Sequence, residues 1–276
     1  MEKQKRNQPE IGILGCGWLG MALGEALVKQ GKIVRGSTRH EQRFAAIKER
    51  GISPYRVHCE EDHFDGIIPF LSGLDQLVIA LPPGLRHTPT RRFDHLIQNL
   101  IPYIKAAMID HVIFISSTSV YGAQEGSIDE NTLPQPVSAS SQQLLACEKA
   151  FSRHSFSSLQ ILRLGGLIGP NRHPIFTLAQ KTRIKNPQGK INYIHQSDAV
   201  GILLACIQAP HFSGIFNGVC PYHPQRSTYF KQMAQLAGLV CPPMAEEQAT
   251  VREISAEKVM STFDYQFIVE NLLTLN

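Results

Sequence analysis

Residues 11–20 read IGILGCGWLG, so that three glycines, at positions 15, 17 and 20, stand in the pattern GxGxxG. A short apolar run, residues 11–14, comes directly before the first of them, and apolar side chains at helical spacing follow as far as Leu27. A strand, a tight turn and a helix in this order are the context in which the pattern binds the pyrophosphate of a dinucleotide. The alternative is a tight turn that holds no ligand.

Each glycine has its own expected role in such a turn. Gly15 permits the turn, Gly17 lets the backbone approach the pyrophosphate, and Gly20 lets the helix pack closely on the strand. The start of the helix supplies backbone N–H groups and the positive end of the helix dipole. We therefore expect Trp18 and Leu19, at this helix start, to contact the cofactor as well.

The residues that end the second predicted strand indicate which dinucleotide is bound. They are Ser37, Thr38 and Arg39. An NAD-preferring site carries Asp or Glu about 20 residues after the glycines, where the carboxylate holds the ribose hydroxyls. A guanidinium beside two hydroxyls suits a 2′-phosphate instead, which a carboxylate would repel. We expect these residues to bind NADP in preference to NAD; the alternative for Arg39 is an ordinary surface arginine.

Apolar runs and helical stripes alternate along the first two-thirds of the chain. Nearly continuous apolar strands joined by helices predict a parallel sheet covered on both faces, which is an α/β fold with a Rossmann-type doubly wound sheet. The predicted strands are residues 11–14, 33–36, 76–81, 112–116 and 159–164, and the predicted helices include residues 19–27 and 93–104.

The pattern changes after residues 169–170, where prolines and histidines become frequent and periodic segments shorten. A strand and a helix are predicted within residues 190–209, with Asp198 as the cap of the helix. A further helix is predicted from residue 227 or 228 to Gly238.

These segments suggest a division of the 276 residues into two parts. We expect residues 1–168, joined by 190–219, to form a dinucleotide-binding domain. Residues 169–276 would form mainly a small substrate lobe, packed over the carboxyl ends of the strands, where ligands of open α/β sheets bind.

Composition argues against several other classes of protein. The net charge of +4 is mild and its densest basic cluster is residues 2–6, so no nucleic-acid binding is expected. The six cysteines form no CxxC pair and are typical of free thiols in a reducing compartment. No segment approaches the roughly 20 apolar residues of a membrane helix, so we expect a cytoplasmic protein. His58 and His63 lack an HExxH or Cys/His cluster, and no metal site is predicted.

Three further segments carry a resemblance to a known family. Residues 115–122 read ISSTSVYG, residues 163–170 read RLGGLIGP, and residues 194–200 read IHQSDAV. In this order they are similar to the SSxxVYG, sixth-strand GP-turn and IHxxDVA segments of the extended short-chain dehydrogenase/reductase superfamily, in its NAD-dependent epimerase/dehydratase group. The resemblance covers most of the chain.

The resemblance implies hydride transfer between a nicotinamide and a carbon that bears oxygen. The substrate would be a small polar metabolite, with nucleotide-sugars among the candidates. The resemblance also implies a homodimer, formed through helices near residues 91–108 and 140–154.

The family's catalytic groups transfer only in part. Its Ser/Thr falls on Ser117, whose hydroxyl would hydrogen-bond the substrate oxygen, with Ser116 beside the cofactor. Its YxxxK pair falls on Ser140 and Leu144, so both the tyrosine and the lysine are absent. Because this chemistry needs a partner for the proton on the oxygen, we take Tyr121 as the candidate donor. The alternative for Tyr121 is a structural ring.

Other polar groups have two readings each. The loop after the fourth predicted strand starts with Leu81 and Pro82, whose backbone we expect to border the cofactor. A basic group follows and favours an anionic substrate, with a solvated helix entry as the alternative; it consists of Arg86, His87, Arg91 and Arg92. Arg172 is either an anion clamp or an exposed loop residue, and His195 is either a titrating group or a buried turn histidine.

Two functions are favoured by the sequence, and a third, a fold-only relative that binds another nucleotide, has no positive sign in it. One is an NADP(H)-binding, epimerase- or reductase-like oxidoreductase. The other is a catalytically inactive NADP(H)-binding sensor or scaffold, in which the absence of the Tyr–Lys pair reflects lost catalysis.

Overall fold

The computed structural model describes residues 9–85, 88–247 and 249–275. The basic cluster at residues 2–6 and two members of the basic loop, Arg86 and His87, lie outside these ranges. Among the residues that are described, no helix is long and apolar enough to cross a membrane. All six cysteines are free thiols.

Seven parallel strands form the central sheet. In spatial order they are β12 (Gly214–Gly218), β9 (Ser158–Leu164), β7 (His111–Ser117), β6 (Gln76–Ile79), β1 (Glu10–Leu14), β2 (Ile33–Thr38) and β3 (Ser53–Arg56). From β1 the chain builds the sheet in one direction with β2 and β3, and later in the other with β6, β7, β9 and β12. Such a reversal is where doubly wound sheets bind dinucleotides. The predicted fold class is confirmed.

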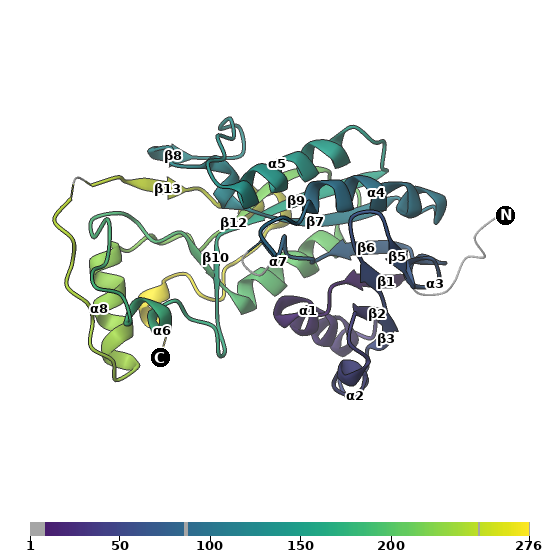
Figure 1. The fold of residues 1–276 in the computed structure, drawn as a ribbon, viewed down its shortest axis with the longest axis horizontal. Helices are drawn as coiled ribbons and strands as arrows, with labels where there is room; N and C mark the ends of the chain where they lie inside the picture. Colours follow the sequence, from purple (N-terminus) through teal and green to yellow (C-terminus); the bar gives the residue numbers. More distant parts are fainter. Residues whose placement is uncertain (1–8, 86–87, 248, 276) are drawn as a thin grey trace.

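Helices cover both faces of this sheet (Figure 1). The main ones are α1 (Trp18–Lys29), α4 (Phe93–Ala106), α5 (Ala139–Ser152) and α7 (Gln196–Gln208). In the view of Figure 1, α4 and α5 lie side by side above the sheet, and α1 and α7 lie below it. The buried face of α1 carries Leu19, Leu23 and Leu27, the helical spacing seen in the sequence.

Shorter elements complete this part of the chain. The remaining helices here are η1 (Glu41–Arg43), α2 (Phe44–Lys48), α3 (Ile67–Leu71), η2 (Thr118–Tyr121) and α9 (Glu257–Phe263). Two short strands, β4 (His58–Cys59) and β5 (Phe64–Asp65), form an antiparallel hairpin directly after β3. This hairpin lies near the carboxyl end of β2, because β2 and β3 are neighbours in the sheet.

A second apolar core lies away from the sheet, on the left of Figure 1. Its elements are β10 (Gly166–Ile168), α6 (Ile175–Leu178), β11 (Tyr193–His195), α8 (Arg226–Leu236) and η3 (Leu272–Thr274). Another parallel pair, β8 (Gly126–Ile128) with β13 (Arg252–Ile254), links a loop of the first half to the C-terminal part. The centre of the second apolar core is aromatic, with Tyr229 and Phe230 both fully buried. The domain boundaries predicted from the sequence stay a prediction.

The segment 190–209 contains the predicted strand and helix, but the cap of the helix differs from its prediction. Its strand, β11, pairs with β10 rather than with the central sheet, whose last strand is β12. The helix α7 is capped by His195, whose Nδ1 accepts the Ser197 N–H (3.3 Å). Asp198 is 1% exposed and instead accepts the N–H groups of Ile268 (2.6 Å) and Val269 (3.1 Å). Burial explains the difference, because a buried carboxylate needs several donors and the C-terminal backbone supplies them.

Candidate functional site

The glycine turn has the backbone geometry that its sequence predicts. Gly15 has a φ of +107°, and a Cβ there would lie 3.0 Å from the Ala80 carbonyl oxygen. A Cβ on Gly20 would lie 2.2 Å from the Gly15 carbonyl oxygen, so helix α1 can approach the turn only with glycine here. A Cβ on Gly17 would meet nothing within 4 Å. The surface above Gly17 is therefore open to a ligand.

The start of α1 offers hydrogen-bond donors that have no partner among the described residues, beside that open surface. Gly17 is the N-cap and provides no side chain to satisfy the first turn. The first helical bond runs from the Met21 N–H to the Gly17 carbonyl (3.0 Å), so the N–H groups of Trp18, Leu19 and Gly20 precede the helical ladder. Three N–H groups at the positive end of a helix form an anion-binding surface.

The end of β2 holds the turn in place and presents one cation. The Ser37 hydroxyl accepts the Gly15 N–H (2.8 Å), and the Ser37 carbonyl accepts the Cys16 N–H (2.8 Å). The Thr38 hydroxyl accepts the His40 N–H (3.2 Å). Both hydroxyls are buried, whereas Arg39 is exposed. Of the three residues assigned to a 2′-phosphate, Arg39 is thus the one that projects outward.

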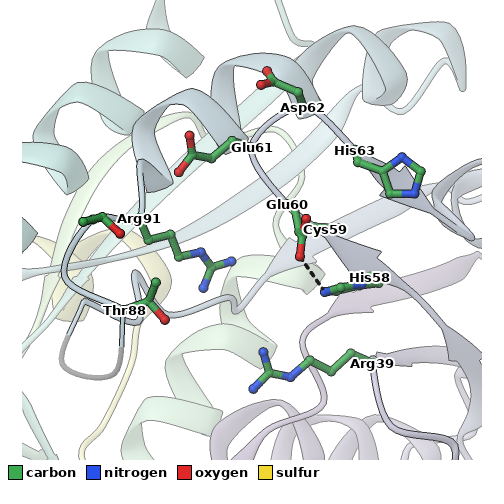
Figure 2. Close-up of a pocket in the computed structure, with 10 residues that line it drawn as sticks. Arg39, His58, Cys59, Glu60, Glu61, Asp62, His63, Thr88 and Arg91 are labelled. Carbon is green, nitrogen blue, oxygen red and sulfur yellow. Dashed lines mark ion pairs between the residues drawn. The ribbon is translucent and has the colours of Figure 1, made fainter.

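A pocket of about 510 Å³ opens beside Arg39. Figure 2 shows the guanidinium groups of Arg39 and Arg91 entering it from two sides. Its other walls are the β4–β5 hairpin and the loop before α4, and its lining consists of Arg39, His58, Cys59, Glu60, Glu61, Asp62, His63, Thr88, Thr90 and Arg91. The hairpin was not predicted from the sequence, and Arg91 was expected either to favour an anionic substrate or to lie at a solvated helix entry. One feature could have indicated this pocket. The hairpin directly follows β3, and β3 is the neighbour of β2 in the sheet, so the hairpin lies near the end of β2 and Arg39.

The loop after β6 lies against the glycine turn. The Ala80 N–H donates to the Leu14 carbonyl (2.9 Å), which extends the β1–β6 pairing to the strand ends. Leu81 follows directly, and its side chain borders Gly15. Leu81 and Pro82 therefore stand beside the open surface of the turn, where we expected the cofactor.

Ser116 belongs to a buried polar network. Its hydroxyl, on a residue that is 5% exposed, donates to Glu148 Oε1 (2.5 Å). Glu148 also forms a fully buried ion pair with Arg163 (Nη2 to Oε2, 2.6 Å). The Arg163 guanidinium lies over the Tyr121 ring, 4.8 Å from its centroid. The network fixes β7, β9 and α5 together below the strand ends.

The predicted proton donor lies inside this network. Tyr121 has no exposed surface, and its hydroxyl donates to Asn217 Oδ1 (2.9 Å). Burial raises the pKa of the Tyr121 phenol further above its usual range. A substrate cannot reach this hydroxyl in the observed arrangement, which favours the structural alternative for Tyr121.

Ser117 and the two positions of the missing pair are placed differently. Ser117 ends β7, is partly exposed, and its Oγ accepts the Ser119 N–H (3.1 Å), which leaves its own proton free to donate. Ser140 is half-buried in the first turn of α5. Leu144, one turn later, is 5% exposed and packs in the main apolar core. The position that the sequence resemblance aligns with the family's lysine is therefore a core side chain.

Trp18 connects the glycine turn to the second core. Its indole N–H donates to the Pro170 carbonyl (3.0 Å), and its own carbonyl accepts the Gln196 side-chain N–H (3.0 Å). The guanidinium of Arg172 lies 5.0 Å from the centre of the indole. We call these contacts of Trp18 with Pro170, Arg172 and Gln196 the Trp18 bridge.

The fold and the glycine turn define a class of protein. The structure superposes on a protein from Methylobacillus flagellatus that is described as a putative NAD-dependent epimerase/dehydratase. The TM-score is 0.76 and the sequence identity is 23%, and the superposition covers 97% of this chain and 96% of the other. It superposes on UDP-glucuronic acid 4-epimerase from Bacillus cereus, solved with UDP-glucuronic acid and NAD, with a TM-score of 0.78 and 18% identity over 94% of each chain. The chain has the fold of the epimerase/dehydratase-type short-chain dehydrogenase/reductase proteins, as the sequence predicted.

Sequence similarity is more specific than the fold. No protein-family model matches the chain. It is 35% identical over 239 residues to Protein YeeZ of Escherichia coli K12, which covers 84% of this chain and 85% of that protein. The chain belongs to the same family as Protein YeeZ.

Proposed function

We propose that the protein is an NADP(H)-binding oxidoreductase of the epimerase or reductase type. The observation that carries the proposal is Arg39, which projects from the end of β2 into the pocket while no carboxylate occupies positions 37–39. This is where the ribose of the adenosine half lies in doubly wound sheets. The open surface above Gly17 and the free N–H groups of α1 would take the pyrophosphate.

The nicotinamide half would extend toward β7, where Ser117 ends its strand. When bound, the cofactor would supply or accept a hydride at a substrate carbon. The Ser117 hydroxyl would hydrogen-bond the oxygen on that carbon, and the proton of that oxygen would be exchanged with solvent at the partly exposed end of β7. The substrate we propose is a nucleotide-sugar, because the fold is shared with a UDP-glucuronic acid epimerase. We do not assign Arg92 to an anionic group of this substrate, because its guanidinium pairs with Asp94 (2.8 Å).

Binding measurements test the cofactor. Titration calorimetry with NADP⁺ and NAD⁺ should show NADP⁺ binding at least about tenfold more tightly, since a charge-assisted phosphate contact contributes about 1.5–3 kcal/mol. Arg39→Gln should remove most of that preference and leave NAD⁺ affinity within about twofold. Tighter binding of NAD⁺ by the unmodified protein would refute the assignment.

Isotope transfer tests the reaction. NADPH deuterated at C4 should pass its label to a keto-sugar nucleotide, and NADP⁺ should become reduced transiently in the presence of a sugar nucleotide. Ser117→Ala should abolish the transfer without weakening NADPH binding. Transfer that survives in Ser117→Ala would remove Ser117 from the mechanism.

A second candidate function is favoured by Leu144 and Tyr121. Leu144, at the position aligned with the family's lysine, is a core side chain, and the Tyr121 phenol, the candidate proton donor, is fully buried. A cofactor-responsive binding protein would need neither a catalytic lysine nor an accessible proton donor. It predicts no label transfer with any substrate, together with a change in oligomeric state or partner affinity between NADP⁺ and NADPH.

A further inference from the structure

We infer that Arg91 is a specificity-determining residue for the cofactor, which binds the 2′-phosphate from the side opposite Arg39. The inference rests on the proposed function, because it deepens the assignment of the pocket. It places a residue of the loop between β6 and α4 in the adenosine site, although Arg91 lies 53 residues beyond the end of β2 in the sequence. Arg91 would thereby serve the cofactor rather than an anionic substrate.

The backbone of Arg91 is fixed. The Gln143 side chain of α5 donates to the Arg91 carbonyl (3.0 Å) and accepts the Phe93 N–H (2.8 Å), so one amide holds the chain on both sides of Arg92. Gly84 has a φ of +76°, and a Cβ there would lie 2.9 Å from Arg91 Nη1. The loop thus leaves room for the guanidinium to reach the pocket, which is unlike a freely moving surface arginine.

Two guanidinium groups share the pocket, and the charges of Glu60 and Glu61 offset only part of the burial and repulsion that lower the pKa of Arg91. Among the described residues, neither Arg39 nor Arg91 takes part in an ion pair; the side chain of Arg39 donates to the His40 ring (3.0 Å) and Arg91 stacks near Phe93 (5.9 Å to the ring centre). Burial lowers the pKa of Arg91, and repulsion by Arg39 lowers it further. A dianion placed between them would remove this repulsion and form charge-assisted hydrogen bonds with both.

The carboxylates of the pocket wall are hydrogen-bonded or paired with other groups, and Glu60 and Glu61 act on Arg91 through their charge alone. Glu60 faces His58 (3.5 Å), Glu61 accepts the Arg92 N–H (2.6 Å), and Asp62 accepts the side-chain N–H of Asn99 (2.8 Å). Burial raises the pKa of the Cys59 thiol to about 12, so this side chain adds no negative charge. The two arginines therefore remain the groups available to an anion in the pocket.

The experiment compares the unmodified protein with Arg91→Gln, Arg39→Gln and the double variant. Each is titrated with NADP⁺, NAD⁺, 2′,5′-ADP and 5′-AMP, and its thermal unfolding is recorded. Arg91→Gln should bind NADP⁺ and 2′,5′-ADP about tenfold or more weakly, and NAD⁺ and 5′-AMP within about twofold of the unmodified protein. The double variant should bind NADP⁺ no better than NAD⁺.

Arg92→Gln is the matched control. It removes the same charge from the adjacent residue, whose guanidinium pairs with Asp94 rather than facing the pocket, and it should leave all four affinities within about twofold. Equal weakening of NADP⁺ and NAD⁺ by Arg91→Gln would overturn the inference, since it would place Arg91 on the adenosine or pyrophosphate. So would unchanged affinity in a folded Arg91→Gln protein.

The two proposals fail separately. If the unmodified protein does not prefer NADP⁺, the proposed cofactor is wrong and the inference about Arg91 falls with it. If the preference exists and depends on Arg39 alone, the cofactor stands and only the role of Arg91 is overturned.

Discussion

Gly17 and Gly20 lie three residues apart, yet the space beside them differs completely. A Cβ on Gly17 would point into open space, and its φ of −77° suits any residue. A Cβ on Gly20 would collide with the Gly15 carbonyl. The first glycine therefore keeps space free for a ligand, while the second keeps space free for the protein itself.

Alanine at each position should separate these roles. Gly17→Ala should lose no more than about 1 kcal/mol of unfolding free energy, because alanine is a poorer N-cap than glycine, but it should bind NADP⁺ at least about tenfold more weakly. Gly20→Ala should lose about 1–3 kcal/mol of unfolding free energy, because the backbone must move to accept the methyl group. Urea unfolding and cofactor titration of both variants measure the difference. A Gly17→Ala protein with full affinity would show that the cofactor does not approach the turn there.

The buried pair Glu148–Arg163 joins α5 to β9. Burial alone lowers the pKa of Arg163, but the hydrogen bonds and charge of Glu148 leave it raised. Glu148→Gln should reduce the unfolding free energy by about 3–5 kcal/mol, because it leaves an uncompensated buried charge.

Glu25→Gln is the control for this pair. Glu25 bonds Lys29 on the surface of α1 (2.9 Å), and its loss should cost no more than about 1 kcal/mol. Urea unfolding of the two variants gives the comparison. Equal costs would mean that Glu148–Arg163 is no stronger than a surface pair.

At the scale of an element, α5 carries Ser140 and Leu144, the positions that the sequence resemblance aligns with a Tyr–Lys pair. The helix starts with a reciprocal cap, in which Ser138 Oγ accepts the Ser141 N–H (3.2 Å) and Ser141 Oγ accepts the Ser138 N–H (3.1 Å). Its buried face then carries Leu144, Cys147 and Phe151 into the main core. The face that would present a lysine is thus part of the packing.

Leu144→Lys should therefore destabilise the protein. We expect a loss of about 3 kcal/mol in unfolding free energy, because an ammonium group would be buried without a partner. Leu144→Met, which keeps volume and polarity, should cost less than about 1.5 kcal/mol. Chemical unfolding of both variants is the measurement. A Leu144→Lys protein as stable as the Met variant would show that the helix can still expose this side chain.

Elements with strong local patterns were predictable from the sequence, and elements set by distant contacts were not. The predicted strand at 112–116 and the helices 19–27 and 93–104 lie within β7, α1 and α4, because apolar spacing alone specifies them. The strand β12 was missed, since Gly214 and Gly218 at its ends read as turn residues. Its place in the sheet depends on pairing with β9.

The site divides in the same way. The turn geometry of Gly15 and Gly20 follows from local sequence, because a tight strand–helix connection demands it. The pairing of Tyr121 with Asn217, and of Asp198 with Val269, joins residues more than 70 positions apart. No spacing in the sequence signals such contacts. Arg91 was visible as a basic residue, but its pocket exists only once the β4–β5 hairpin is folded beside β2.

At the scale of the whole molecule, three histidines tie stability to pH. Burial lowers the pKa of His111, His173 and His195 below the ordinary value. Below about pH 6.5 the unfolded chain therefore binds more protons than the folded protein. The stabilisation that these three neutral histidines provide is therefore fully present above about pH 6.5 and is lost as the pH falls below it.

Urea unfolding between about pH 7.5 and pH 5.5 should show this decline. His111→Gln should make the decline shallower, because it removes one of the three groups that take up a proton on unfolding. A free energy of unfolding that stays constant or rises toward pH 5.5 would contradict the assignment of neutral, buried histidines.

The Trp18 bridge also has an optical consequence. Trp18 is the single tryptophan of the chain, so the native fluorescence above the tyrosine background comes from one indole, held between the glycine turn and Pro170. The protein thus carries an intrinsic probe at the place where a pyrophosphate would bind and where the second core touches the first. Emission recorded during a nucleotide titration would report on that place alone, without a label and without a change to the sequence.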